Sequence, residues 1–274
     1  MGGRSGRSHT SIDRRVRHVC RPSFPEKKMK EKIQELLRET ERQHDIRLLF
    51  ACESGSRAWG FPSADSDYDI RFIYLREREA YLSVGEIPDQ LGDTPGEWDM
   101  QGWDLRKVLR LLLKSNSTPF EWIQSPIIYQ ADDLFVNAFR RLIPGYFSPR
   151  CQVKHYLGIA FTQLGELKEE TIRVKKLCYV LRSLLSAEWI LARNAFAPME
   201  MEPLMVFLPT GLREETRALI ATKATGTEAD TIVLSSGMKQ YITTHLAEAE
   251  RRAADLPVYR FPREDLDAFF RAFV

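Results

Sequence analysis

The 274-residue chain is poor in cysteine and has no long apolar run. Its four cysteines form no Cys-x-x-Cys pair, so the sequence indicates neither a zinc site nor a disulfide framework. No apolar stretch approaches the length of a membrane span, and the basic N-terminus lacks the apolar core of a signal peptide. The five histidines are scattered, which argues against a histidine ligand set. We therefore expect a cytoplasmic protein with no membrane partner.

An excess of charge of either sign is also lacking. Lys and Arg number 40 and Asp and Glu 38, so the formal net charge is only +2. The overall charge therefore gives no argument for nucleic acid, although a local patch such as Arg106, Lys107, Arg110 and Lys114 offers phosphate contacts. Hydrophobic and charged fractions of 43% and 28% are typical of a soluble globular protein. The arginine-rich residues 1–28 are the exception and predict a disordered basic arm.

Apolar periodicity predicts an α+β first part and a helical second part. The first part is expected to contain a helix at 29–44, strands at about 46–52, 68–75 and 97–103, and helices from 105 and at 131–142. Pro144 and Gly145 mark a domain boundary. Beyond it the pattern predicts helices almost throughout, at about 151–170, 171–194, 212–222, 226–252 and 263–272. We expect a catalytic domain at 29–145 and a helical C-terminal domain at 146–274.

The chemistry is concentrated in residues 53–74. Gly55 and Ser56 follow one apolar run, and about ten residues later Asp67 and Asp69 open another. Successive side chains of a strand point to opposite faces, so Asp67 and Asp69 point the same way. Two aligned carboxylates at a strand start form a clamp for a divalent metal, and small residues in a turn let backbone N–H groups approach a phosphate. The stretch therefore predicts a site for Mg²⁺ and a nucleoside triphosphate (NTP).

A third carboxylate would complete the metal that activates the nucleophile in nucleotidyl transfer. Asp99 lies inside the predicted third strand, where a partner of residues 68–74 would run. Asp104 lies at the start of an amphipathic helix, where N-capping alone explains it. We favour Asp99 and keep Asp104 as the alternative.

Several blocks of the sequence carry a family resemblance. Gly55-Ser56, about ten residues and then Asp67-x-Asp69 in a strand resembles the signature of the DNA polymerase beta-type nucleotidyltransferase superfamily. The longer string is similar to a bacterial and phage branch of predicted nucleotidyltransferases linked to an RNA-repair pathway. Its blocks are Cys52–Gly60, Asp65–Phe72, Gly102–Lys107, Glu121-Trp122-x-x-Ser125-Pro126 and Lys175-Lys176-x-x-Tyr179-Val180-Leu181-Arg182. The similarity covers roughly residues 29–205.

The resemblance implies a small mixed sheet flanked by helices, a following helical domain and a triphosphate in the cleft between them. It implies an EC 2.7.7-type enzyme that uses Mg²⁺, with Mn²⁺ as a substitute, to transfer a nucleoside monophosphate (NMP) to a hydroxyl. Gly55 and Ser56 would contact the β- and γ-phosphates, and Asp67 and Asp69 would bind the two metals. The third acid maps less cleanly, so Asp99 stays provisional.

Other residues fit supporting roles. The guanidinium fork of Arg57 matches phosphate oxygens, but an ion pair with Glu53 or Asp65 explains it equally. Members of the superfamily take a basic or hydroxyl group and an aromatic from the helical domain, and Lys176 and Tyr179 fit these roles by type. A solvated helix face is the alternative for both.

The acceptor is open at this level. An RNA 3′ end, such as that of a tRNA, is what the resemblance implies. The same motif serves members that modify a protein or a small-molecule hydroxyl. A third reading is an inactive nucleotide- or RNA-binding module, against which the intact Asp67 and Asp69 count. NTP preference and oligomeric state are not readable from the sequence.

The carboxylate clamp is testable by substitution. Asp67→Ala is expected to abolish Mg²⁺-dependent NTP binding, because one of the two aligned carboxylates is removed. Isothermal titration of each NTP with Mg²⁺ into wild type and variant measures this. Equal binding heats in the two proteins would contradict the assignment, and metal-dependent binding without turnover on any acceptor would favour the inactive module.

Overall fold

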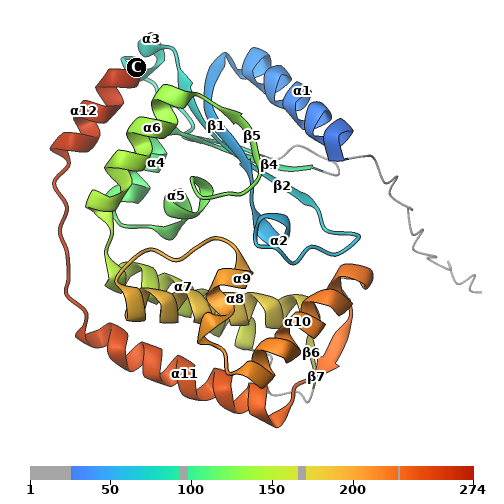
Figure 1. The fold of residues 1–274 in the computed structure, drawn as a ribbon. Helices are drawn as coiled ribbons and strands as arrows, with labels where there is room; N and C mark the ends of the chain where they lie inside the picture. Colours follow the sequence, from blue (N-terminus) through green and yellow to red (C-terminus); the bar gives the residue numbers. More distant parts are fainter. Residues whose placement is uncertain (1–25, 93–97, 166–170, 228) are drawn as a thin grey trace, which may run out of the picture.

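The computed structural model describes residues 26–92, 98–165, 171–227 and 229–274 (Figure 1). The predicted basic arm lies outside the described residues, except for residues 26–28, which belong to the first helix. The expected α+β class is confirmed, because a five-stranded sheet with flanking helices is followed by a mostly helical part. In the part of the chain that the structure describes, no helix has the length and apolar character needed to cross a membrane.

The sheet is mixed. Its strands run in the order β3 (Gln90–Leu91), β4 (Trp98–Asp104), β2 (Tyr68–Arg76), β1 (Ile46–Glu53) and β5 (Ile128–Ala131). β1 is antiparallel to β2 and β5, β3 is antiparallel to β4, and β2 is parallel to β4. The three strands predicted from apolar runs are confirmed. β5 overlaps the start of the helix predicted at 131–142, which begins only at 133.

Helices cover both faces of the sheet. Ile33 and Leu37 of α1 (Glu26–His44) are fully buried against the face that carries Ile70 and Phe72. The opposite face packs against α4 (Leu105–Leu113), α5 (Ser117–Trp122) and α6 (Asp133–Leu142). The short α2 (Gly55–Ala58) and α3 (Arg78–Tyr81) follow β1 and β2, and η1 (Ile143–Tyr146) leads into the helical part.

The second part is built on two long helices packed side by side, α7 (Pro149–Leu164) and α8 (Val174–Arg193). Around them lie α9 (Met201–Leu204), η2 (Met205–Phe207), α10 (Thr210–Thr225) and α11 (Ser236–Asp255). Leu177, Leu181 and Leu184 of α8 are almost completely buried in this core. The apolar spacing of residues 174–190 thus becomes the centre of the helical part.

Two strands interrupt the predicted run of helices. β6 (Thr171–Arg173) pairs antiparallel with β7 (Thr231–Val233). The helices predicted from 171 and from 226 are therefore wrong at their starts, and begin at Val174 and Ser236. The residues concerned are rich in β-branched side chains, which favour strands. Both helices were predicted to start too early because the residues that follow each strand have helical periodicity.

The last helix departs from the predicted division of the chain. α12 (Glu264–Phe273) lies beside α4 and α6 of the sheet-containing part (Figure 1). Leu266 is buried there, and the ring of Phe273 packs edge-on against Phe135 with centroids 5.5 Å apart. The segment predicted as one helical domain, 146–274, thus ends by packing into the core of the first part.

This packing predicts that α12 stabilises the sheet-containing part. Leu266→Ala should lower the free energy of unfolding by about 2–5 kcal/mol, because it opens a cavity in a closed core. Arg271→Ala, at an exposed position of the same helix, should change it by less than about 0.5 kcal/mol. Urea denaturation followed by circular dichroism measures both. Equal, small losses for the two variants would show that α12 is only loosely attached.

Candidate active site

The turn after β1 runs directly against a carboxylate of β2. Gly55 has φ +58°, a left-handed conformation, and a Cβ added there would lie 1.9 Å from Oδ2 of Asp69. The N–H of Ser54 also donates to the carbonyl of Asp69 at 2.8 Å. Only glycine satisfies both the backbone conformation and the close approach. The Gly55-Ser56 turn and Asp69, which the sequence separates by over ten residues, are therefore in contact.

The parallel register of β2 and β4 sets a second carboxylate beside the first. Asp69 pairs with Asp99 across the two strands. One guanidinium nitrogen of Arg71 bridges them, at 2.9 Å from Asp69 and 2.7 Å from Asp99. Asp67 lies one residue before β2 and is exposed. The structure thus brings Asp69 and Asp99 together, with Asp67 at the same end of the sheet.

Asp104, the alternative third acid, lies elsewhere on β4. It is opposite Tyr74, and its carboxylate accepts from the N–H of Arg106 and from the hydroxyl of Tyr81, both at 2.8 Å. Burial raises the pKa of Asp104, although these donors oppose the shift. This is the N-capping geometry considered from the sequence. Asp104 is committed to the start of α4 and does not join the other acids.

The pKa values of the two neighbouring acids, Asp69 and Asp99, are shifted in opposite directions. Burial raises the pKa of Asp69 despite the charge of Arg71, and the carboxylates of Asp99 and Asp67 add to the rise. For Asp99, partial burial is outweighed by the hydrogen bond and charge of Arg71, so its pKa lies below the ordinary value. Negative charge is therefore concentrated here and compensated by one bridging arginine.

A divalent cation such as Mg²⁺ needs oxygen ligands, and three acids lie at this end of the sheet. Carboxylate oxygens are the donors that Mg²⁺ and Mn²⁺ prefer, so Asp67, Asp69 and Asp99 fit by type. Across residues 26–92, 98–165, 171–227 and 229–274, however, no three acidic, histidine or cysteine side chains converge as a ready metal site. Arg71 lies between Asp69 and Asp99. A cation bound by both would take over the charge compensation that Arg71 now provides.

Glu53 is a site residue that sequence reasoning missed. It is fully buried at the end of β1, accepts from the N–H of Asp69 at 2.8 Å and is hydrogen-bonded to the hydroxyl of Tyr129. Burial raises its pKa to about 7. Glu53 thus fixes the backbone of β2 at Asp69. An acidic residue ending an otherwise apolar strand, directly before the Gly-Ser turn, was the signal available in the sequence.

Arg57 braces the loop that carries Asp67. Its guanidinium donates to the carbonyls of Asp67 at 3.2 Å and Ser66 at 2.9 Å, and lies 4.0 Å from the ring centre of Tyr68. Ser56 is buried, and its hydroxyl donates to the hydroxyl of Ser66 at 3.1 Å. Both residues therefore hold the loop in this structure.

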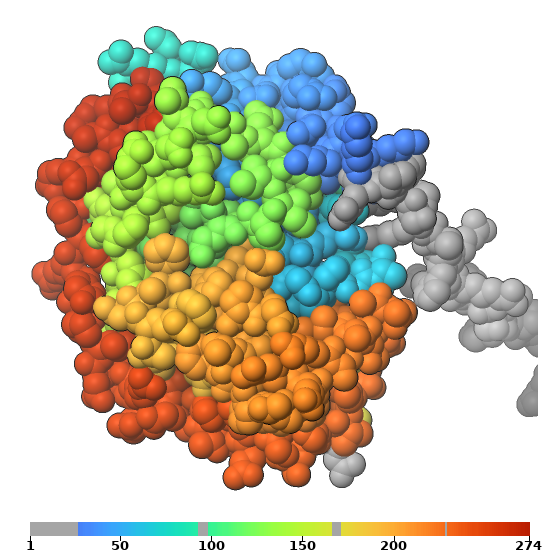
Figure 2. All heavy atoms as spheres, in the orientation of Figure 1, coloured from blue at the N-terminus to red at the C-terminus, as the bar shows by residue number. Residues whose placement is uncertain are grey.

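A buried lysine ties the same loop to the helical part. Lys223 of α10 is 1% exposed and donates to the carbonyl of Phe61 at 2.9 Å and to the hydroxyl of Ser63 at 3.3 Å. The space-filling view shows the orange helical segment against the blue and cyan segment after β1 (Figure 2). The sequence offered no sign of this contact, because Lys223 looks like a solvated helix residue.

Between the two parts lies a cavity of about 300 Å³ that reaches Arg71, the residue that bridges Asp69 and Asp99. Its walls include Ser54, Arg71, Trp59, Trp103, Glu121, Tyr179 and Arg182. Glu121 accepts from the hydroxyl of Tyr156 at 2.7 Å and from Arg182 at 3.1 Å, which pins the two parts together. The ring of Tyr179 lies edge-on to Trp59 at 4.9 Å. This cavity is aromatic and adjoins Arg71.

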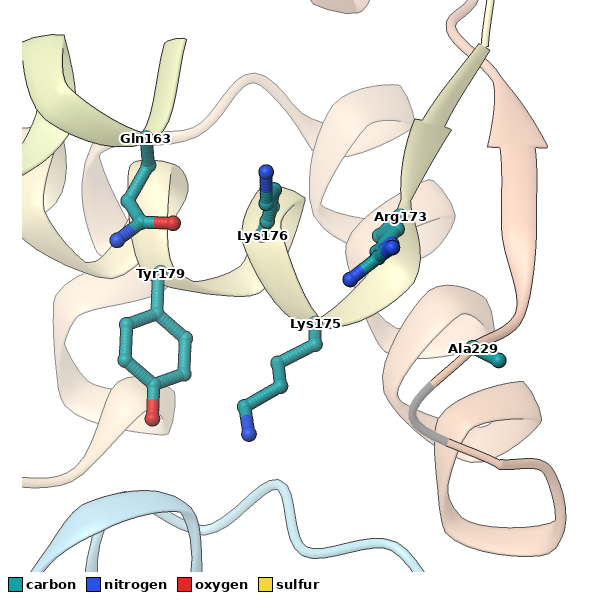
Figure 3. Close-up of a pocket in the computed structure, with 6 residues that line it drawn as sticks. All are labelled: Gln163, Arg173, Lys175, Lys176, Tyr179 and Ala229. Atoms are coloured by element: carbon teal, nitrogen blue, oxygen red, sulfur yellow. The ribbon is translucent and has the colours of Figure 1, made fainter. Parts of the chain in front are cut away.

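A second cavity, of about 460 Å³, is basic. Arg173, Lys175, Lys176 and Tyr179 line it, with Gln163 and Ala229 (Figure 3). In Figure 3 Lys175 and Tyr179 extend toward the blue ribbon of the sheet-containing part, whereas Lys176 extends the other way. Tyr179 borders both cavities. Of the two adjacent lysines, Lys175 is the one directed toward the sheet-containing part.

The chain is similar to known proteins over most of its length. A model of the RNA repair pathway DNA polymerase beta family matches residues 29–272. Uncharacterized protein YcgL of Bacillus subtilis (strain 168) is 35% identical over 232 residues, which cover 83% of this chain and 89% of that protein. The tRNA (34-2'-O)-methyltransferase regulator WDR6 of Drosophila melanogaster is 28% identical over 82 residues, which are 29% of this chain and 8% of that protein.

The contact between Gly55 and Asp69 gives a matched test. Gly55→Ala and Gly60→Ala both place a side chain at positive φ, which costs about 1–2 kcal/mol. Only Gly55→Ala also drives a methyl group into Asp69, which Arg71 holds in place, so it should lose about 1–3 kcal/mol more. Chemical denaturation of both variants decides this. If Gly60→Ala is the more damaging change, the proposed close approach is wrong.

Proposed function

The chain belongs to the RNA repair pathway DNA polymerase beta family, a group of polymerase beta-type nucleotidyltransferases, and from this premise we propose that it transfers an NMP from an NTP to an RNA 3′ hydroxyl. The observation that carries the proposal is the pairing of Asp69 with Asp99 directly against the Gly55 turn. Acids alone would suit many metal sites. Acids in contact with a glycine turn suit a metal-bound triphosphate.

Asp67, Asp69 and Asp99 are the residues that would hold Mg²⁺, with Mn²⁺ as a substitute. When bound, the metal ions neutralise the triphosphate charge and activate the attacking hydroxyl. Glu53 keeps the Asp69 backbone in place, and Arg57 and Ser66 keep the Asp67 loop in place. The role of the protein is thus to position charged groups, which is the main requirement of this chemistry.

The donor NTP is proposed to lie between the sheet and α8. Its β- and γ-phosphates would approach the backbone at Gly55 and Ser56, with Lys175 and Lys176 supplying positive charge from the basic cavity. Tyr179 borders this cavity and the aromatic one beside Arg71, so a base placed there would meet Tyr179 and Trp59. The two cavities together have room for both ends of a nucleotide.

The acceptor side is assigned to Asp99, because its side chain is 56% exposed compared with 24% for Asp69. Its lowered pKa keeps it ionised at neutral pH, which suits a group that holds the acceptor hydroxyl. In the reaction the acceptor oxygen bonds to the α-phosphorus. The bond from that phosphorus to the oxygen bridging to the β-phosphate breaks, pyrophosphate leaves and the hydroxyl proton passes to water.

Isosteric changes at two acids of the same strand separate catalysis from folding. Asp99→Asn should lower turnover at least about 100-fold, because a charge that acts on the reacting groups is lost. Asp104→Asn should keep turnover, because asparagine caps a helix as well as aspartate does. The measurement is transfer of label from each α-labelled NTP with Mg²⁺ to total RNA, a tRNA pool and cell protein, alongside thermal unfolding of both variants.

Two results would oppose the proposal. If label enters protein and never RNA, the acceptor is a protein hydroxyl and not an RNA hydroxyl, although the nucleotidyl transfer itself is as proposed. Full activity of Asp99→Asn together with loss in Asp104→Asn would move the third acid to Asp104.

A further inference from the structure

A third cavity lies on the α1 face of the sheet and is not needed for the donor nucleotide. Its volume is about 450 Å³, and we call it the α1 cavity. It is lined by Lys27, Met29, Lys30, Ile33, Arg57, Pro62, Tyr68, Ile127 and Tyr129. These residues come from the start of α1, from α2 and its following loop, and from the start of β2 and β5. Figure 1 shows the N-terminal end of α1 beside the end of the sheet where β2 begins.

The lining of the α1 cavity is cationic. Lys27, Lys30 and Arg57 contribute positive charge, and the lining contains no carboxylate. Lys27 and Lys30 are exposed. They stand at the N-terminal end of a 19-residue helix, where the macrodipole is already positive. Positive side chains at this end lower the stability of the helix by itself, but they suit the binding of an anionic ligand.

The cavity also offers an aromatic surface. Tyr68 contacts both the Arg57 guanidinium, 4.0 Å from its ring centre, and the ring of Trp98, whose centre lies 5.3 Å from that of Tyr68. The ammonium of Lys32 lies 4.9 Å from the ring centre of Trp98. Cations and aromatic rings therefore alternate along this edge of the sheet. Bases of a single strand stack on such surfaces while the cations hold its phosphates.

The walls of the α1 cavity are linked to the backbone that carries Asp67 and Asp69, although none of the acids lines the cavity itself. Tyr68 is flanked in sequence by Asp67 and Asp69, and Arg57 holds the carbonyl of Asp67. Tyr129, another wall, is hydrogen-bonded to Glu53, which in turn holds the N–H of Asp69. None of the residues of the basic cavity around Lys175 lines the α1 cavity. A ligand in the α1 cavity would therefore leave the residues of the basic cavity available to the proposed donor.

We propose that the α1 cavity binds the terminal nucleotides of a single-stranded RNA acceptor, with phosphates on Lys27 and Lys30 and a base against Tyr68. This inference rests on the proposed nucleotidyltransferase function and adds the place where the acceptor binds. A polynucleotide is favoured over an acidic peptide because the site pairs cations with a stacked aromatic surface, which an acidic peptide would leave unused.

The probe is a 5′-fluorescein 12-nucleotide single-stranded oligoribonucleotide with a free 3′ hydroxyl, and the readout is anisotropy with the full chain over a range of salt concentrations. Lys27→Ala/Lys30→Ala should flatten the plot of log K against log salt by about 1.4, since each phosphate contact on a single strand contributes about 0.7. Tyr68→Leu should raise Kd about 5- to 150-fold with the slope unchanged, because stacking is lost and no charge is removed.

Lys28→Ala/Lys239→Ala is the matched control. It removes the same charge from exposed positions that do not line the α1 cavity, so its slope should stay close to that of wild type. An equal flattening in both double variants would show diffuse electrostatic attraction and overturn the proposal. Competition by poly-glutamate as effective as that by unlabelled RNA would also overturn it. If the thermal melt shows that Tyr68→Leu does not fold, the salt slopes of the two double lysine variants still test the proposal.

NTP binding and RNA labelling by wild type, measured in parallel, separate this inference from the function on which it rests. If wild type labels RNA and the cavity variants bind the oligoribonucleotide as tightly, with the same salt slope, only the inference is wrong. If wild type neither binds nor transfers NTP while the predicted slopes hold, the cavity binds a strand but the proposed function fails, and with it the acceptor role.

Discussion

The parallel pairing of β2 with β4 places Asp69 and Asp99 side by side, and the surrounding structure depends on how their repulsion is balanced. Arg71, two residues beyond Asp69, bridges both carboxylates. Burial raises the pKa of Asp69 while Arg71 lowers that of Asp99, so two acids of one cluster differ in their affinity for a proton. Under the proposed function, this charge imbalance would be relieved by a cation and the anionic ligand bound with it.

The cavity beside Arg71 is enclosed by two parts of the chain, and contacts between residues far apart in sequence join these parts. The largely buried ion pair of Glu121 with Arg182 joins α5 to α8, and the buried Lys223 of α10 contacts the loop after β1. α12 then returns to the sheet-containing part and closes its core. Because breaking a buried pair leaves an uncompensated charge, these contacts limit how freely the two parts can move apart.

Much of the local structure was predictable because it follows short-range periodicity. The buried runs before Gly55 and after Asp67 became β1 and β2, and the stripe of Ile33 and Leu37 became α1. The errors arose where local preference and tertiary pairing compete, as at β6 and β7, whose short β-branched segments form strands only because each has the other as a partner. Glu53 was missed because its carboxylate is explained by hydrogen bonds to Tyr129 and Asp69, which only the fold brings together.

The sequence by itself determined the turn-and-carboxylate motif, because Gly55, Asp67 and Asp69 lie within one hairpin-like stretch whose spacing local geometry controls. The tertiary structure decided which distant residues join that stretch. Strand register placed Asp99, and not Asp104, beside Asp69, and Lys175 rather than Lys176 extends toward the sheet-containing part (Figure 3). It also formed the α1 cavity from three separate segments. Such choices depend on contacts between residues remote in sequence, which periodicity along the chain does not encode.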